Sequence, residues 1–175
     1  MEGQKSGCIS PASYDFIVPL HMRILMVCLG NICRSPLADG ILRNKVSHRQ
    51  LPWMVDSAGT AAYHIGNPPD LRMIQTAKSN GIDISGLRAR QFTSQDFEDF
   101  DRIYVMDQSN YKNVLAMANS NTDRQKVSLL LDHLYPNKQL EVPDPYYGNQ
   151  SDFDAVFTLV NEATEALISD LTNDK

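Results

Sequence analysis

Cysteine is scarce in this sequence. Three cysteines occur in 175 residues, at positions 8, 28 and 33, an odd number without the spacing of a disulfide framework. Small secreted domains that depend on disulfides carry many more. We therefore expect a protein of the reducing cytoplasm, in which a special cysteine serves reactivity and not cross-linking.

Long apolar runs and basic clusters are also missing. No segment approaches the roughly 20 apolar residues of a membrane-spanning helix, so we expect no membrane insertion. The formal net charge is −5 and Lys and Arg form no run, which argues against a nucleic-acid partner. Residues 1–21 lack the apolar core of a signal peptide and are expected to be a flexible N-terminal arm. Residues 22–175 have the length and apolar content of a single domain.

From residue 22 onward, short β-rich runs alternate with helical patterns. Strand patterns cover residues 22–27, 53–59, 102–107 and 126–132, and helical patterns follow each of them. The alternation predicts an α/β fold of three layers, with a four-stranded parallel sheet and helices on both faces. Ligands bind beyond the carboxyl ends of the strands in such folds.

Several residues mark the expected helix ends. Ser35 is predicted to cap the first helix, with Pro36 at its first position. The segment 67–70 begins the second helix, which should turn Leu71, Ile74 and Ala77 inward and stop at Gly81. Thr93 with Asp96, and Ser151 with Asp154 before the last helix, have the spacing of capping pairs.

The segment CLGNICRS, Cys28 to Ser35, stands between the first strand and the first helix. Such a turn aims backbone N–H groups at one anion, and Gly30 is expected to supply unusual backbone angles. Arg34 adds a planar fork that matches two phosphate oxygens. These surroundings lower the pKa of a cysteine, and the Ser35 hydroxyl can bond to the thiolate. The Cys-x5-Arg-Ser spacing thus predicts phosphoryl transfer to Cys28 with no metal or cofactor.

Simpler interpretations of the same residues are weaker. A lone cysteine at a strand end is usually inert core, but here the strand, Gly30, Arg34 and Ser35 are all in register. A zinc site would need two more ligands, and the four histidines form no matching pair. The segment also lacks the Gly-Lys-Ser/Thr ending of a nucleotide-binding P-loop. We expect no metal.

A proton donor is predicted near the other end of the chain. Hydrolysis of an aryl phosphate needs an acid for the leaving oxygen. Asp144 lies between two prolines in VPDPYYG, and Tyr146 and Tyr147 follow the second proline. This segment follows the last strand, so it should reach the rim that carries the Cys28 loop. An acid and two flat aromatic walls there suit a phosphotyrosine pocket.

These two motifs resemble those of the low-molecular-weight protein tyrosine phosphatases. VCLGNICRSP is similar to the phosphate-binding loop of that family, and DPYYG to its acid loop, within a similarity that spans Met22 to about Asp170. The resemblance implies a flavodoxin-like fold of the phosphotyrosine phosphatase I type. It also implies metal-independent hydrolysis of phosphotyrosine and aryl phosphates through a phosphocysteine intermediate.

The resemblance assigns roles residue by residue. It implies Cys28 as the nucleophile, Arg34 as the phosphate clamp and Asp144 as the acid and later the base. The implied substrate-binding residues are Leu29, Gly30, Asn31, Ile32, Cys33, Ser35, Tyr63, Tyr146 and Tyr147. The implied partner is a phosphotyrosine protein, for example a tyrosine kinase, and we expect a monomer or weak dimer.

Cys33 has a second expected role. Bending of the loop around an anion can bring the Cα atoms of Cys28 and Cys33 within the ~7 Å limit for a disulfide. A reactive thiolate is the first target of peroxide, and a neighbouring thiol can capture the sulfenic acid. The pair is therefore predicted to be redox-active.

One departure and three alternatives remain open. Many relatives have a histidine that helps hold the loop asparagine where this chain has Leu87, so Asn31 needs another partner. Arsenate reductases of this fold need a further cysteine pair, and beyond the loop this chain offers Cys8. Protein arginine phosphatases have threonine at the position of Ile32. A phosphotyrosine-binding module without turnover is the third alternative.

Overall fold

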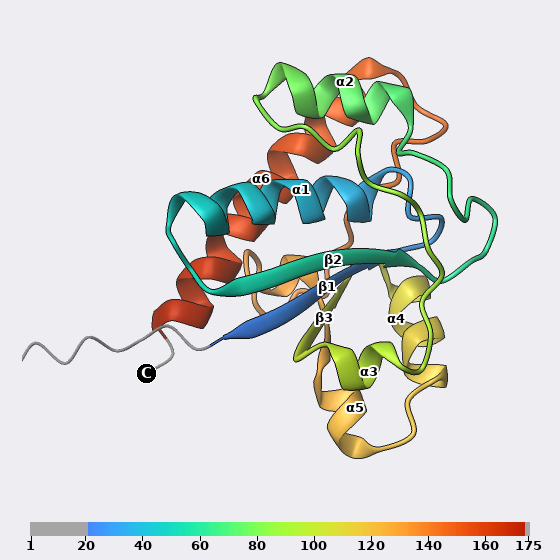
Figure 1. Ribbon diagram of the computed structural model, residues 1–175, viewed down its shortest axis with the longest axis vertical. Helices are drawn as coiled ribbons and strands as arrows, with labels where there is room; N and C mark the ends of the chain where they lie inside the picture. The colour runs from blue at the N-terminus through green and yellow to red at the C-terminus, as the bar shows by residue number, and fades with distance from the viewer. Residues whose placement is uncertain (1–20, 174–175) are drawn as a thin grey trace, which may run out of the picture.

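The structure, a computed structural model, describes residues 21–173, so that the expected arm at 1–21 lies almost wholly outside it. Strands and helices alternate along this part of the chain (Figure 1). The elements in chain order are β1 (Met22–Cys28), α1 (Arg34–His48), β2 (Trp53–Gly59), α2 (Leu71–Ser79), α3 (Asp96–Asp99), β3 (Arg102–Val105), α4 (Gln108–Ala116), α5 (Asn121–Gln125), β4 (Val127–Leu129), the 3-10 turn η1 (Leu130–Asp132) and α6 (Gln150–Asn173).

The four strands form one parallel sheet in the order β2-β1-β3-β4, which confirms the predicted sheet. β1 is central and residues 24–27 are fully buried, because helices cover both faces. Ile24 and Met26 pack in the core under α1 and α6, and Leu25 and Val27 face the second core under α3 and α4. Figure 1 shows the layers, with α1, α2 and α6 on one face and α3, α4 and α5 on the other. Within residues 21–173, every helix is too short or too polar to cross a membrane.

Tertiary contacts shorten the predicted elements. β4 ends at Leu129, although the pattern extends to residue 132. The register explains this, because Leu129 pairs with Val105, the last residue of β3, and residues 130–132 run past the end of that strand. The helix expected around residues 111–118 is the nine-residue α4, and α5 follows as a separate short helix.

The predicted helix ends are partly wrong. α2 begins as expected, with the Asp70 carboxylate accepting the Arg72 N–H, and it stops before Gly81, whose φ is +79°. Leu71, expected inside, is 67% exposed because the buried side of α2 is formed by Met73, Thr76 and Ala77.

The two serine caps are also wrong. Ser35 lies inside α1, where Cys33 holds the N-cap position, and the Ser35 hydroxyl turns into the preceding loop. At α6, Asn149 takes the capping role expected of Ser151: its side-chain oxygen accepts the Ser151 N–H at 2.8 Å, and Asp152 accepts the Asn149 N–H at 2.7 Å. Asparagine and serine cap equally well, so that their relative preference does not decide the position.

Three segments meet at the carboxyl edge of the sheet. The loop at residues 29–33 leaves β1, and residues 60–70 leave β2 beside it, where the Ala61 N–H donates to the Leu29 carbonyl at 2.9 Å. The segment before α6 reaches the same edge because the Val142 N–H donates to the Met106 carbonyl at 2.8 Å, just beyond β3. The fold thus brings residues near positions 28, 63 and 144 to one place.

Candidate active site

The loop between β1 and α1 curls around the sulfur of Cys28. Cys28 is buried at the end of β1. The Asn31 backbone N–H points at its Sγ from 3.3 Å, and the Ser35 Oγ lies 3.0 Å from the same sulfur. Both groups can donate to a thiolate, so the loop is built to receive negative charge.

Asn31 carries the conformational constraint of this loop. Its φ is +55°, in the left-handed region that asparagine tolerates better than most residues. Gly30 was expected to supply the unusual backbone angles, but its φ is not positive, so that expectation is wrong. A larger residue at position 30 would instead be short of space, because its Cβ would lie 3.0 Å from the Cδ2 of His64.

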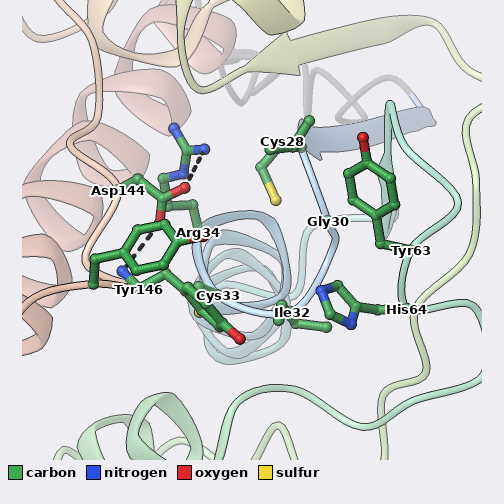
Figure 2. A pocket seen from close by; sticks show the side chains of 11 residues that line it. Cys28, Gly30, Ile32, Cys33, Arg34, Tyr63, His64, Asp144 and Tyr146 are labelled. Atoms are coloured by element: carbon green, nitrogen blue, oxygen red, sulfur yellow. Dashed lines mark hydrogen bonds and ion pairs between the residues drawn. The ribbon is translucent and has the colours of Figure 1, made fainter.

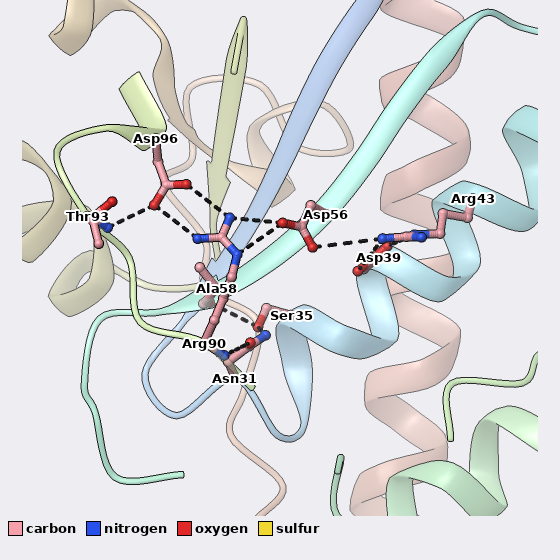
Figure 3. Close-up of polar contacts among 9 residues, drawn as sticks. All are labelled: Asn31, Ser35, Asp39, Arg43, Asp56, Ala58, Arg90, Thr93 and Asp96. Carbon is pink, nitrogen blue, oxygen red and sulfur yellow. Dashed lines mark hydrogen bonds and ion pairs between the residues drawn. The ribbon is translucent and has the colours of Figure 1, made fainter. Parts of the chain in front are cut away.

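Asn31 finds its partners without the family histidine. Its side-chain amide donates to Ser35 Oγ at 2.9 Å, and its Oδ1 accepts the backbone N–H of Arg90 at 2.9 Å (Figure 3). Leu87, at the place of the histidine, packs against the apolar core. The Arg90 backbone therefore provides a hydrogen bond where the leucine side chain has none to offer.

The Arg90 side chain is itself fixed between two carboxylates. Its Nη2 lies 2.9 Å from Asp56 Oδ2 on β2 and 3.0 Å from Asp96 Oδ1 on α3. Asp96 is buried, and it also accepts the Thr93 N–H at 2.8 Å, the half of that capping pair that the structure confirms. This bridge holds the backbone of residue 90 against the loop.

The network continues from β2 into α1 (Figure 3). Arg43 lies 3.8 Å from Asp56 and also pairs with Asp39, which is fully buried. Burial raises the pKa of Asp39, and the hydrogen bond and positive charge of Arg43 oppose that shift. A chain of alternating charges thus connects the helix that follows the loop to the segment that holds Asn31.

Arg34 is a buried cation that connects the two predicted motifs. Its Nη1 donates to Asp107 Oδ2 at 2.6 Å and to the Val142 carbonyl at 3.2 Å, and its Nη2 donates to Asp144 Oδ2 at 2.9 Å. Burial works to lower the pKa of Arg34, but the negative charges of Cys28, Asp144 and Asp107 outweigh it and the pKa is raised. The guanidinium therefore stays charged.

These residues surround one pocket, shown in Figure 2. Tyr146 and Tyr63 stand on opposite sides of it, with the sulfur of Cys28 and Arg34 between them. Tyr147 meets Tyr146 edge to face, with ring centroids 5.0 Å apart. The pocket is lined by Cys28, Leu29, Gly30, Ile32, Cys33, Arg34, Tyr63, His64, Asp144, Tyr146 and Tyr147. Of the predicted site residues, Asn31 and Ser35 are outside this set: Asn31 is buried in the loop and Ser35 in the first turn of α1.

Cys33 differs from Cys28 in its surroundings. It lines the pocket but is buried at the N-terminus of α1. Burial raises its pKa strongly, and the negative charges of Asp70, Cys28 and Asp144 add to the effect. Cys33 is therefore a protonated thiol at neutral pH.

Three residues of the site were not predicted from the sequence. Asp107 lies two residues beyond β3 and pairs with Arg34. An acid at the end of a predicted strand was a signal that could have identified it. His64 follows Tyr63 in the loop after β2 and lines the pocket. Arg90 acts through its backbone and through pairs that join distant segments, and no local pattern marks it.

Comparison with known proteins gives a consistent result. A family model described as low molecular weight phosphotyrosine protein phosphatase matches residues 23–175. The human low molecular weight phosphotyrosine protein phosphatase is 47% identical over 137 residues, which are 77% of this chain and 85% of the human protein. A solved protein tyrosine phosphatase from Entamoeba histolytica is similar with a TM-score of 0.81 at 38% identity, covering 87% of this chain and 98% of its own. A Drosophila arginine phosphatase is similar with a TM-score of 0.82 at 33% identity, covering 88% and 100%.

The Arg90 bridge can be tested by substitution. Arg90→Met leaves the buried Asp96 without its cation and loosens the segment that holds Asn31. We expect a loss of about 1–3 kcal/mol in the free energy of unfolding, measured by denaturant titration, and weaker binding of vanadate. Arg88→Met is the matched control, since Arg88 is exposed and donates to carbonyls of its own segment. Equal stability and vanadate affinity in both variants would contradict this role.

Proposed function

The chain belongs to the low molecular weight phosphotyrosine protein phosphatase family and is a protein tyrosine phosphatase, and from that premise we propose that it hydrolyses phosphotyrosine through Cys28, Arg34 and Asp144. The observation that carries the proposal is the bonding of Arg34. One guanidinium lies in the Cys28 pocket and contacts Asp144, which is 110 positions away in the sequence, at 2.9 Å. Nucleophile, clamp and acid thus share one pocket.

In the first step, the Cys28 thiolate attacks phosphorus. An S–P bond forms while the bond from phosphorus to the phenol oxygen breaks, and Asp144 gives its proton to that oxygen. Arg34 and the loop N–H groups hold the phosphate oxygens, where charge spreads in the transition state. The Ser35 hydroxyl, 3.0 Å from the sulfur, stabilises Cys28 as the attacking and later the leaving thiolate.

In the second step, water attacks the phosphocysteine. Asp144, now a carboxylate, takes a proton from that water, the S–P bond breaks, and phosphate leaves with the thiolate restored. Every group needed is a side chain or a backbone N–H of this chain, so the proposal includes no metal and no cofactor.

The walls of the pocket support an aryl substrate. Tyr63 and Tyr146 flank the space above Cys28, and Ile32 adds an apolar side chain to the lining. A phenyl ring is buried favourably against the apolar Ile32 side chain, whereas the N–H donors of a guanidinium group find no hydrogen-bond acceptor on it. This supports phosphotyrosine over phosphoarginine, although the fold is shared with an arginine phosphatase.

The proposal extends to partner and compartment. The substrates are phosphoproteins, and we place a tyrosine kinase among them. Cys28 and Cys33 are both free thiols, which suits the reducing cytoplasm, and we expect a monomer or a weak dimer there.

We also place Cys33 as a resolving thiol. Peroxide converts the Cys28 thiolate to a sulfenic acid, and the Cys33 thiol then displaces its hydroxyl group as water to form a Cys28–Cys33 disulfide. A dithiol reduces this bond again. The two cysteines line one pocket, which supports the pairing.

The nucleophile is tested with Cys28→Ser. A serine hydroxyl is almost wholly protonated at neutral pH, while the anion-binding loop remains. We expect turnover to fall by orders of magnitude with vanadate binding still measurable. Retention of more than about a tenth of wild-type turnover would contradict the assignment.

The acid is tested with Asp144→Asn and its control Asp154→Asn, an exposed residue of α6. Asparagine at position 144 keeps the shape but lacks the proton, so phenyl phosphate, whose phenol has a pKa of about 10, should lose about 10²–10⁴-fold in kcat/KM, which reports the step that releases the phenol. p-Nitrophenyl phosphate should lose less because its leaving group departs as the anion. Equal losses on the two substrates would exclude the acid role.

The redox role is tested with Cys33→Ser. Wild-type enzyme inactivated by peroxide should recover with dithiothreitol, and the variant should be active at first but recover far less. Intact mass should show a wild-type protein about 2 Da lighter and a variant that gains oxygen. Equal recovery, or a disulfide that maps to Cys8, would exclude this role.

A further inference from the structure

The N-terminus of α2 is fixed to the phosphate-binding loop. The Asp70 backbone N–H donates to the Ile32 carbonyl at 2.8 Å. The Asp70 carboxylate caps α2 by accepting the Arg72 backbone N–H at 2.8 Å. The side chain of Asp70 is mostly buried, so this end of the helix has a well-defined position beside the Cys28 pocket.

Arg72 folds back from α2 onto the same carboxylate. Its Nε lies 3.0 Å from Asp70 Oδ1 and its Nη2 lies 2.8 Å from Oδ2, a two-pronged pair. The hydrogen bond from Arg72 is the main reason that the pKa of Asp70 is lowered. Because Asp70 is ionised at neutral pH, it holds the guanidinium in one orientation.

The held guanidinium reaches across to the acid loop. Its Nη2 also donates to the Tyr146 carbonyl at 3.0 Å. Its Cζ lies 5.6 Å from the centroid of the Tyr146 ring and 4.5 Å from that of Phe153, the first buried residue of α6. Arg72 therefore contacts both the backbone and the ring of Tyr146, and stacks where the acid loop enters α6.

Tyr146 is also the residue that orients the acid. Its backbone N–H donates to Asp144 Oδ1 at 3.1 Å, and Arg34 holds the other oxygen, Oδ2, at 2.9 Å. A continuous path of contacts thus runs from Ile32 through Asp70, Arg72 and Tyr146 to the Asp144 carboxylate. It joins the two loops by a second route, besides the link through Arg34.

We propose that Arg72, held by Asp70, is a positioning residue that fixes the acid loop relative to the phosphate-binding loop and so enables proton transfer from Asp144. The inference rests on the proposed function. Among residues 21–173, the hydrogen bonds and ring stacking of the Arg72 side chain involve Asp70, Tyr146 and Phe153, and Arg72 does not line the pocket. It therefore acts through the loop and not on the reacting atoms.

The role predicts a specific kinetic signature. Without the guanidinium, Tyr146 loses a partner for its carbonyl and its ring, and the Asp144 carboxyl spends less time in reach of the leaving oxygen. The loss should fall on substrates whose leaving group needs a proton. A merely structural role would reduce the amount of active enzyme and lower kcat/KM equally for every substrate.

The experiment measures kcat/KM, which reports the step that releases the leaving group, for Arg72→Met on phenyl and p-nitrophenyl phosphate, with active enzyme counted by vanadate titration. We expect about a tenfold loss on phenyl phosphate and at most about a threefold loss on p-nitrophenyl phosphate. Arg72→Lys keeps the positive charge but not the planar guanidinium, and its loss on phenyl phosphate should lie between those of wild type and Arg72→Met. Arg88→Met, at an exposed arginine with local contacts, should match wild type on both.

Asp70→Asn provides a second route in case Arg72→Met fails to fold. Asparagine still caps α2, but it lacks the charge that holds the guanidinium. The loss should therefore again be larger on phenyl phosphate than on p-nitrophenyl phosphate, and smaller than in Arg72→Met. The double variant Arg72→Met/Asp144→Asn should lose no more on phenyl phosphate than Asp144→Asn alone, since both remove one proton transfer.

Two results separate the possible failures. If Asp144→Asn shows the leaving-group dependence and Arg72→Met loses equally on both substrates, the positioning role is wrong and the proposed function stands. If Asp144→Asn shows no such dependence either, the acid assignment fails, and this inference fails with it.

Discussion

The structure depends on one turn that must place several N–H groups and a sulfur around a single point. That turn requires Asn31 in the left-handed conformation, with a φ of +55°. A residue stays in this region when its surroundings fix it there. Here Ser35 and the backbone of Arg90 hold the asparagine side chain, and two carboxylates, on β2 and α3, hold Arg90 in turn. The sheet and helices thus hold Asn31 in the conformation that the loop requires.

A second constraint is the burial of Arg34. A buried cation is unfavourable unless counter-charges and hydrogen bonds surround it. Asp107 from the end of β3 and Asp144 from the segment before α6 supply them, and these contacts draw two distant parts of the chain to the end of β1. The charge that the fold must neutralise is, in our proposal, the charge that clamps the phosphate. Stability and function therefore use the same contacts.

Much of this could be predicted from the sequence, for physical reasons that differ between features. The alternation of buried strands and amphipathic helices predicts the parallel sheet, because β1 is apolar on both faces. The segments around Cys28 and Asp144 indicate the pocket because their chemistry is local. His64 and Arg90 were missed, since their places in the site depend on contacts between distant segments, whereas Asp107 carried a local signal, an acid at the end of a predicted strand. The serine caps were wrong because neighbouring polar residues compete for the same N–H groups. Leu87 cannot hydrogen-bond to Asn31 as the family histidine does, and the backbone N–H of Arg90 donates to the Asn31 side chain.

The central claim is that phosphate passes through the sulfur of Cys28. The most direct test is to quench the enzyme with acid during turnover of radiolabelled phosphotyrosine peptide and to locate the label by peptide mapping under conditions that preserve phosphocysteine. The account predicts a transient S–P linkage on the peptide that contains Cys28, absent from enzyme alkylated at that residue beforehand. Label on another residue, or turnover without a covalent intermediate under conditions that trap phosphocysteine, would contradict it.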